Sequence, residues 1–166
     1  MVAALLIGDM SKFLFFFSML FLAITDQAFG QQDSTVNITD DIQVDVKSIA
    51  LDSNSDTLTV ELFLISYQMD PREFKLNAFA TQLVDDSGGS HLFWSIQMGR
   101  VLVKIGDRQN YLHYLIEENE PVPFTLKIAD WGEKKVSKLN VVFEDSNEAG
   151  KFITHQVNLI PSQLEN

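Results

Sequence analysis

The sequence predicts an all-β fold: an antiparallel two-sheet sandwich of the immunoglobulin-like type, with seven to nine strands. Three observations predict it. Apolar and polar residues alternate along many short segments, turn-forming residues separate these segments, and no segment carries a dependable helical pattern. The chain has 166 residues, which is enough for one such domain. A small β-barrel is the alternative that the same pattern allows.

The domain is expected over residues 42–161, and its first two strands are the most clearly predicted. Residues 42–51 and 57–67 each alternate apolar with polar side chains, and the residues between the two segments are all turn formers. This pattern predicts a β-hairpin. A shift in the alternation near Ser48 predicts a β-bulge in the first strand.

The segment 74–84 is ambiguous, because its apolar residues fit both a helical stripe and a strand. Its β-rich neighbours favour a strand. Along residues 92–98 every second residue is apolar and large, which predicts a strand with Trp94 in the core. The remaining strands are expected at residues 101–105, 111–116, 124–128, 139–143 and 153–159.

The first thirty residues have the three-part pattern of a secretory signal peptide. Lys12 precedes an apolar run, residues 13–24, that is short for a bilayer span of about 20 residues. Ala28 and Gly30 then supply the small residues of a cleavage site, and Met10 is the expected true start. The mature protein is therefore expected to be secreted or periplasmic. An uncleaved membrane anchor is the less favoured alternative.

The mature chain is expected to begin with a flexible, polar lead-in over residues 31–41 and to end with a short tail, residues 162–166. The whole chain carries 23 acidic and 12 basic residues, a net charge of −11. This balance argues against binding to nucleic acid or to an anionic membrane surface, since both depend on Lys and Arg. The chain has no Cys, which excludes disulfides, thiolate metal sites, Cys nucleophiles and a lipoprotein signal.

No catalytic residues are predicted. The chain has no G-x-S-x-G motif, and its three histidines, His91, His113 and His155, are far apart in the sequence. His155 falls on the apolar side of its expected strand, where a buried structural histidine is the favoured interpretation. The alternative is a small exported carbohydrate-active hydrolase that uses dispersed carboxylates.

One segment has part of a calcium-binding pattern. Asp52, Asn54 and Asp56 match the first half of an EF-hand loop, but Thr57 and Phe63 stand where the loop needs Gly and Glu. A hairpin turn predicts the same residues without a metal. No cofactor is therefore expected, with calcium at this turn as the alternative.

The expected contact surface is centred on Trp131, which lies in a polar loop after a strand. An exposed Trp there would serve as a platform for a sugar or as a protein contact. Tyr111 and Tyr114 are expected to form a similar patch. The other interpretation, which the position of Trp131 at the exit of a strand favours, is that its side chain closes the end of the sandwich.

The order of features resembles a family of secreted bacterial immunoglobulin-like domains of unknown function. The resemblance covers about residues 44–159 and depends on an L-x-D-x-x-G turn and a P-x-x-F-x-L strand entry. The matching residues are Leu83, Asp85 and Gly88, then Pro121, Phe124 and Leu126. The Phe-rich signal and the Gly–Gln cleavage edge are similar to those of Bacteroidetes-type exported proteins.

The resemblance implies a binding or accessory module of the cell envelope with a protein or glycan partner. This chain lacks the lipobox Cys that many members carry, so lipid anchoring is not expected. A subunit of a surface assembly, pairing through an edge strand, is the alternative.

Overall fold

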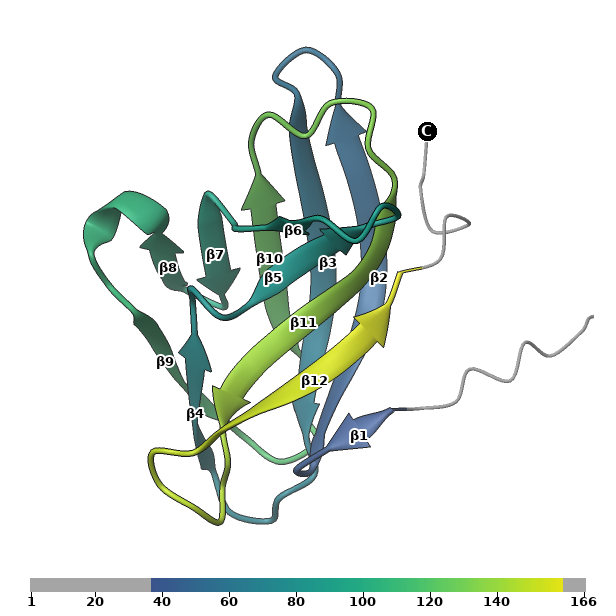
Figure 1. The fold of residues 1–166 in the computed structure, drawn as a ribbon. Coiled ribbons are helices and arrows are strands. Elements are labelled where there is room, and N and C mark those ends of the chain that lie inside the picture. The colour runs from purple at the N-terminus through teal and green to yellow at the C-terminus, as the bar shows by residue number, and fades with distance from the viewer. Residues whose placement is uncertain (1–36, 160–166) are drawn as a thin grey trace, which may run out of the picture. The chain divides into compact units, whose positions relative to one another are not determined.

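The computed structural model describes residues 37–159, and there it shows twelve β-strands and one short 3-10 helix, η2 (Ile105–Asp107). The expected all-β fold is confirmed: the strands form two antiparallel sheets (Figure 1). The predicted signal peptide, the start at Met10 and the tail 162–166 lie outside the described residues. Within 37–159, no helix has the length and apolar character needed to cross a membrane.

The first sheet, which we call sheet A, has six strands. Their order across the sheet is β1 (Ile38–Thr39), β2 (Ile42–Asp52), β3 (Thr57–Ser66), β10 (Val122–Ile128), β7 (Ser95–Met98) and β8 (Val101–Lys104). The predicted hairpin is confirmed as β2 and β3, and the predicted bulge lies between Val46 and Ser48. Leu58, Val60, Leu62 and Leu64 of β3 all point into the core.

The second sheet, sheet B, packs its inner face against sheet A. Its order is β6 (Ser90–His91), β5 (Gln82–Asp85), β11 (Val136–Glu144), β4 (Arg72–Asn77) and β9 (Tyr111–Ile116), and β12 (Phe152–Asn158) pairs with β11. Phe74, Phe143 and Leu139 are buried on its inner face, and the rings of Phe74 and Phe143 lie 5.0 Å apart. The two inner faces form one continuous core.

The strand order is that of an immunoglobulin sandwich. In that fold, the first, second, fifth and fourth strands form one sheet, and the third, sixth and seventh form the other. Here β2-β3-β10-β7 and β4-β11-β12 take those places in the same chain order. The remaining strands, β1, β5, β6, β8 and β9, are additions to this core, so residues 37–159 contain twelve strands rather than the expected seven to nine.

Two sequence-based expectations need correction in detail. The segment 74–84 is neither one strand nor a helix, because it turns between β4 and β5. Asn77 makes the turn: its side-chain oxygen accepts the Ala80 amide at 3.0 Å. The lead-in expected over 31–41 includes β1, so residues 38 and 39 are paired with β2 rather than free.

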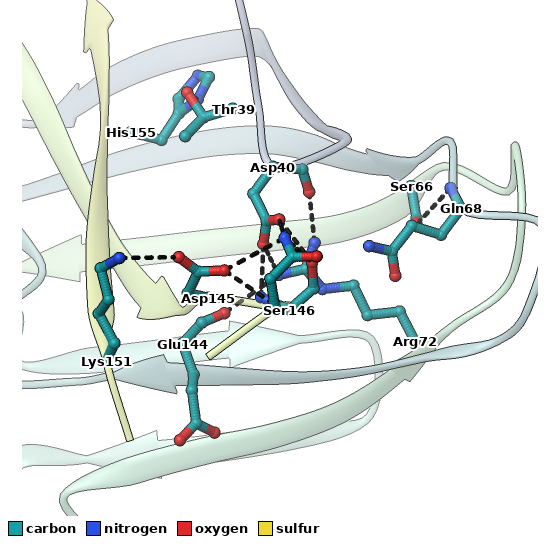
Figure 2. A network of polar contacts seen from close by, with 11 residues as sticks. Thr39, Asp40, Ser66, Gln68, Arg72, Glu144, Asp145, Ser146, Lys151 and His155 are labelled. Carbon is teal, nitrogen blue, oxygen red and sulfur yellow. Dashed lines mark hydrogen bonds and ion pairs between the residues drawn. The ribbon is translucent and has the colours of Figure 1, made fainter. Parts of the chain in front are cut away.

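A buried ion pair fixes the start of the domain (Figure 2). The guanidinium of Arg72, at the start of β4, contacts the carboxylate of Asp40, which follows β1; both side chains are less than a tenth exposed. Arg72 also donates to the Glu144 carbonyl at 3.1 Å, and Asp40 accepts the Ser146 amide at 2.9 Å. Asp40 has a φ of 51°, a left-handed conformation that Asp tolerates better than most residues. The pair therefore ties three distant segments together.

Candidate functional site

Trp131 is buried, so the expectation that it forms an exposed platform is wrong. Its side chain is 1% exposed, and its indole nitrogen donates to the Lys134 carbonyl at 2.7 Å. The backbone explains this placement. Asp130 and Gly132 both have positive φ, and the Gly132 amide donates to the Asp56 carboxylate at 2.8 Å. These contacts fold the loop inward, so Trp131 closes the end of the sandwich, as the alternative interpretation held.

The expectation for Trp94 is wrong in the opposite direction: it was expected in the core, but its side chain is 51% exposed. Residues 92–94 cross from sheet B to sheet A, so the alternation begins again at the crossing, and Phe93 takes the buried position instead. The Trp94 amide donates to the Lys127 carbonyl at 2.8 Å, and its carbonyl accepts the Ile105 amide at 3.1 Å. Both bonds hold the exposed indole over the edge of sheet A.

An open groove of about 320 Å³ lies beside Trp94 on the outer face of sheet A. Its floor comes from β3 and β10, and one end is the turn between β2 and β3. In Figure 1 this turn and the β10–β11 connection lie together at the top of the sheet. The lining is polar apart from Trp94 and one alanine: Asp52, Ser55, Thr57, Thr59, Trp94, Lys127 and Ala129.

The predicted half calcium loop forms one end of this groove. The Asp52 carboxylate accepts the Asn54 amide at 2.9 Å and the Ser55 hydroxyl at 2.8 Å, and these bonds lower the pKa of Asp52. Asp56 is in a left-handed conformation and holds Gly132. The turn thus accounts for these residues without a metal. Among residues 37–159, no three His, Asp or Glu side chains are grouped as metal ligands.

Tyr111 and Tyr114 do not form the expected patch, because they point to opposite faces of β9. Tyr111 stacks on Phe152 with ring centres 5.5 Å apart, on the outer face of sheet B. The ammonium of Lys75 lies 4.9 Å from the Tyr111 ring. Tyr114 points inward and packs over Gly99.

The histidines form no catalytic arrangement with one another. His91 contacts Asp85 at 2.8 Å, and the Ser87 hydroxyl donates to the same carboxylate at 2.7 Å. Hydrogen bonds from Ser87, His91 and Gly89 hold the pKa of Asp85 far below its usual range. The serine therefore contacts the acid rather than the imidazole, which differs from the order of contacts in a Ser-His-Asp triad.

The other two histidines have structural neighbours. His113 is exposed and lies 3.1 Å from Glu73. His155 is 1% exposed, as its alternation predicted. Its Nδ1 lies 2.7 Å from the Thr39 hydroxyl, and within the described chain its Nε2 has no partner.

Comparison with known proteins finds no matching family model, no matching curated protein and no matching solved structure. The groove beside Trp94 is therefore assigned from its own geometry. The sequence did contain one signal for it. Leu92, Phe93 and Trp94 are three large apolar residues in a row, and a strand can bury only every second one.

Proposed function

We propose that this chain is an exported, non-enzymatic binding module whose groove beside Trp94 holds a carbohydrate chain of the cell envelope. The observation that carries the proposal is the half-exposed indole next to an open groove with a polar floor. Tryptophan is enriched at contact surfaces, because its large apolar ring gains much from burial while its N–H can still donate a hydrogen bond. It is thus the natural centre of a binding surface.

The chemistry of the lining suits a sugar. A pyranose ring has an apolar face of C–H groups, which packs on an indole, and a rim of hydroxyls, which need both donors and acceptors. Thr57 and Thr59 supply hydroxyls that do both, Asp52 accepts and Lys127 donates. A few oriented polar groups beside one apolar surface are typical of small-ligand sites.

The module interpretation is supported by the state of the titratable groups. Ser87 and His91 each bond to the Asp85 carboxylate, and none of these three residues lines the groove. Asp52 does line the groove, but hydrogen bonds from Ser55 and Asn54 lower its pKa, which makes its carboxylate a weak base. The predicted signal peptide supports the export of the chain, and the resemblance to secreted bacterial immunoglobulin-like domains supports an accessory role.

The test is retardation of the purified protein in native gels that contain single polysaccharides. We expect at least one polysaccharide to slow the parent, and Trp94→Ala to abolish the effect. Leu115→Ala is the matched control, because Leu115 is 57% exposed on the outer face of sheet B. If no polysaccharide slows the parent, or if Trp94→Ala is slowed equally, the proposal is wrong.

A further inference from the structure

A straight row of side chains crosses the outer face of sheet A at the groove. The register pairs Ala50 with Thr59, Thr59 with Lys127, Lys127 with Ser95, and Ser95 with Lys104. Directly paired residues point to the same face of a sheet. The row therefore runs perpendicular to five strands and ends in two lysines that flank one short serine.

Both lysines belong to the surroundings of Trp94. The Trp94 amide is bonded to the backbone of Lys127, and Lys127 lines the groove. The ammonium of Lys104 lies 5.5 Å from the centre of the indole ring. Two strand spacings separate the backbones of the lysines, which is about 10 Å. The exposed indole thus has the Lys104 ammonium beside it and shares its groove with Lys127.

These two charges are not neutralised by the protein. Across residues 37–159, Lys47, Arg72, Lys75 and Lys151 are in ion pairs with carboxylates, whereas neither Lys104 nor Lys127 is. Both are exposed. The carboxylate of Asp107 is bonded to the backbone amide of Lys104, at 3.1 Å.

The same edge of the sheet carries further unpaired cations. Arg100 and Arg108 flank β8 and η2, are exposed, and belong to none of the ion pairs of the described chain. Lys134, Lys135 and Lys138 are likewise in no ion pair of the described chain, so what distinguishes Lys104 and Lys127 is their place beside Trp94. Asp52, at the other end of the groove, lies on β2 and is separated from Lys127 of β10 by β3.

We propose that the groove selects an anionic polysaccharide, one that carries carboxylate or sulfate groups on its sugars. A sugar ring packs on Trp94, the neighbouring acidic groups pair with Lys127 and Lys104, and the hydroxyls of the next sugars reach Thr57 and Thr59. This inference rests on the proposed function and names the ligand class for the same groove.

The net negative charge of the protein does not oppose such a ligand at close range. At physiological ionic strength the Debye length is about 8 Å, so distant acidic residues are largely screened. A lysine in contact with an acidic group, at about 4 Å, retains most of its attraction. Binding should consequently weaken as salt rises, because the contacts are exposed.

The experiment measures affinity by titration calorimetry with four probes: polygalacturonate, the same polymer fully methyl-esterified, dextran sulfate and polyglutamate. The variants are Lys127→Gln, Lys104→Gln and Trp94→Ala. Lys135→Gln is the control, because Lys135 is an exposed lysine away from the row and is in no ion pair of the described chain. All three lysines are exposed, so each variant should fold.

We expect polygalacturonate or dextran sulfate to bind at least tenfold more tightly than the esterified polymer. Each lysine variant of the row should weaken that binding by about fivefold, the upper range for an exposed ion pair, and Lys135→Gln by less than twofold. Trp94→Ala should lose all polysaccharide binding.

Three results overturn the inference. Equal binding of neutral and anionic polymers, unchanged by either lysine variant, refutes the charge selection and leaves the proposed function standing. If polyglutamate binds as tightly as the anionic polysaccharides, the groove recognises acidic polypeptide chains rather than acidic sugars. Binding of none of the three polysaccharides overturns the inference, and the native gels with other polysaccharides then decide the proposed function separately.

Discussion

Replacing Arg72 with methionine should destabilise the domain strongly, because it leaves the buried carboxylate of Asp40 without its counter-ion. Arg72 and Asp40 are 4% and 8% exposed, so neither has ready access to water (Figure 2). Methionine keeps the apolar stem of the side chain but removes the guanidinium that lies over the Phe143 ring, and with it every charged donor. Asp40 would then keep only Ser146 and Asn147 as partners, and the Glu144 carbonyl would lose a donor.

The expected loss is about 3–5 kcal/mol, the usual cost of breaking a buried ion pair by removing one partner. A domain of this size has a total stability of roughly 5–15 kcal/mol, so the variant should lose a large share of it. The assay is urea unfolding followed by tryptophan fluorescence. The slope of the unfolding free energy against urea concentration (the m-value) should stay unchanged if the transition remains two-state.

Two further variants make the result specific. Lys47→Met removes an ion pair to Glu61 that is about half exposed, and it should cost less than about 1 kcal/mol. Combining Arg72→Met with Asp40→Asn should cost less than the sum of the single changes, since no uncompensated charge remains. A loss below about 1 kcal/mol for Arg72→Met would refute the reasoning, because the pair would then behave as a surface contact.

Three other predictions concern single residues. Trp131→Ala should cost about 3–5 kcal/mol in urea unfolding and Trp94→Ala less than about 1 kcal/mol, because only the first indole is buried; equal losses would contradict the assigned burial. Burial lowers the pKa of His155 from 6.5, so the unfolded chain takes up the proton first. The unfolding free energy should therefore fall as pH drops below about 6.5. His155→Gln should remove this fall in unfolding free energy below pH 6.5. If the variant shows the same pH dependence as the parent, the assignment to His155 is wrong. Gly99→Ala should lower the melting temperature, because Gly99 has a φ of 53° and an added Cβ would clash with the Tyr114 ring; an unchanged melting temperature would show that the ring moves away freely.

The parts of the fold that the sequence predicts are those set by local rules. The β2–β3 hairpin combines strict alternation with a turn made only of turn formers, so its position and bulge follow from nearby residues. The burial of His155 follows from alternation in the same way. The strands β1 and β6 have two residues each, too few for alternation to identify them, whereas β7 and β8 lie within strands that alternation does predict.

The candidate site depends on contacts that no local rule contains. Whether Trp94 or Phe93 is buried is decided by where the chain crosses between the sheets, and that crossing is set by pairing with Lys127 far along the chain. The burial of Trp131 depends on its loop bonding to Asp56. The groove itself exists because β2, β3 and β10 lie side by side. Residue types at these positions could suggest a binding surface but could not place it.

The most direct test of the central claim uses the two tryptophans as separate reporters. In Trp131→Phe the emission comes from Trp94 alone, and in Trp94→Phe it comes from Trp131 alone. Titration with polygalacturonate should shift the emission of Trp131→Phe to shorter wavelength, since a sugar ring would shield an indole that is 51% exposed. The emission of Trp94→Phe should stay constant. A constant Trp94 signal at saturating polysaccharide, with bound ligand shown by calorimetry, would place the ligand elsewhere and contradict the account.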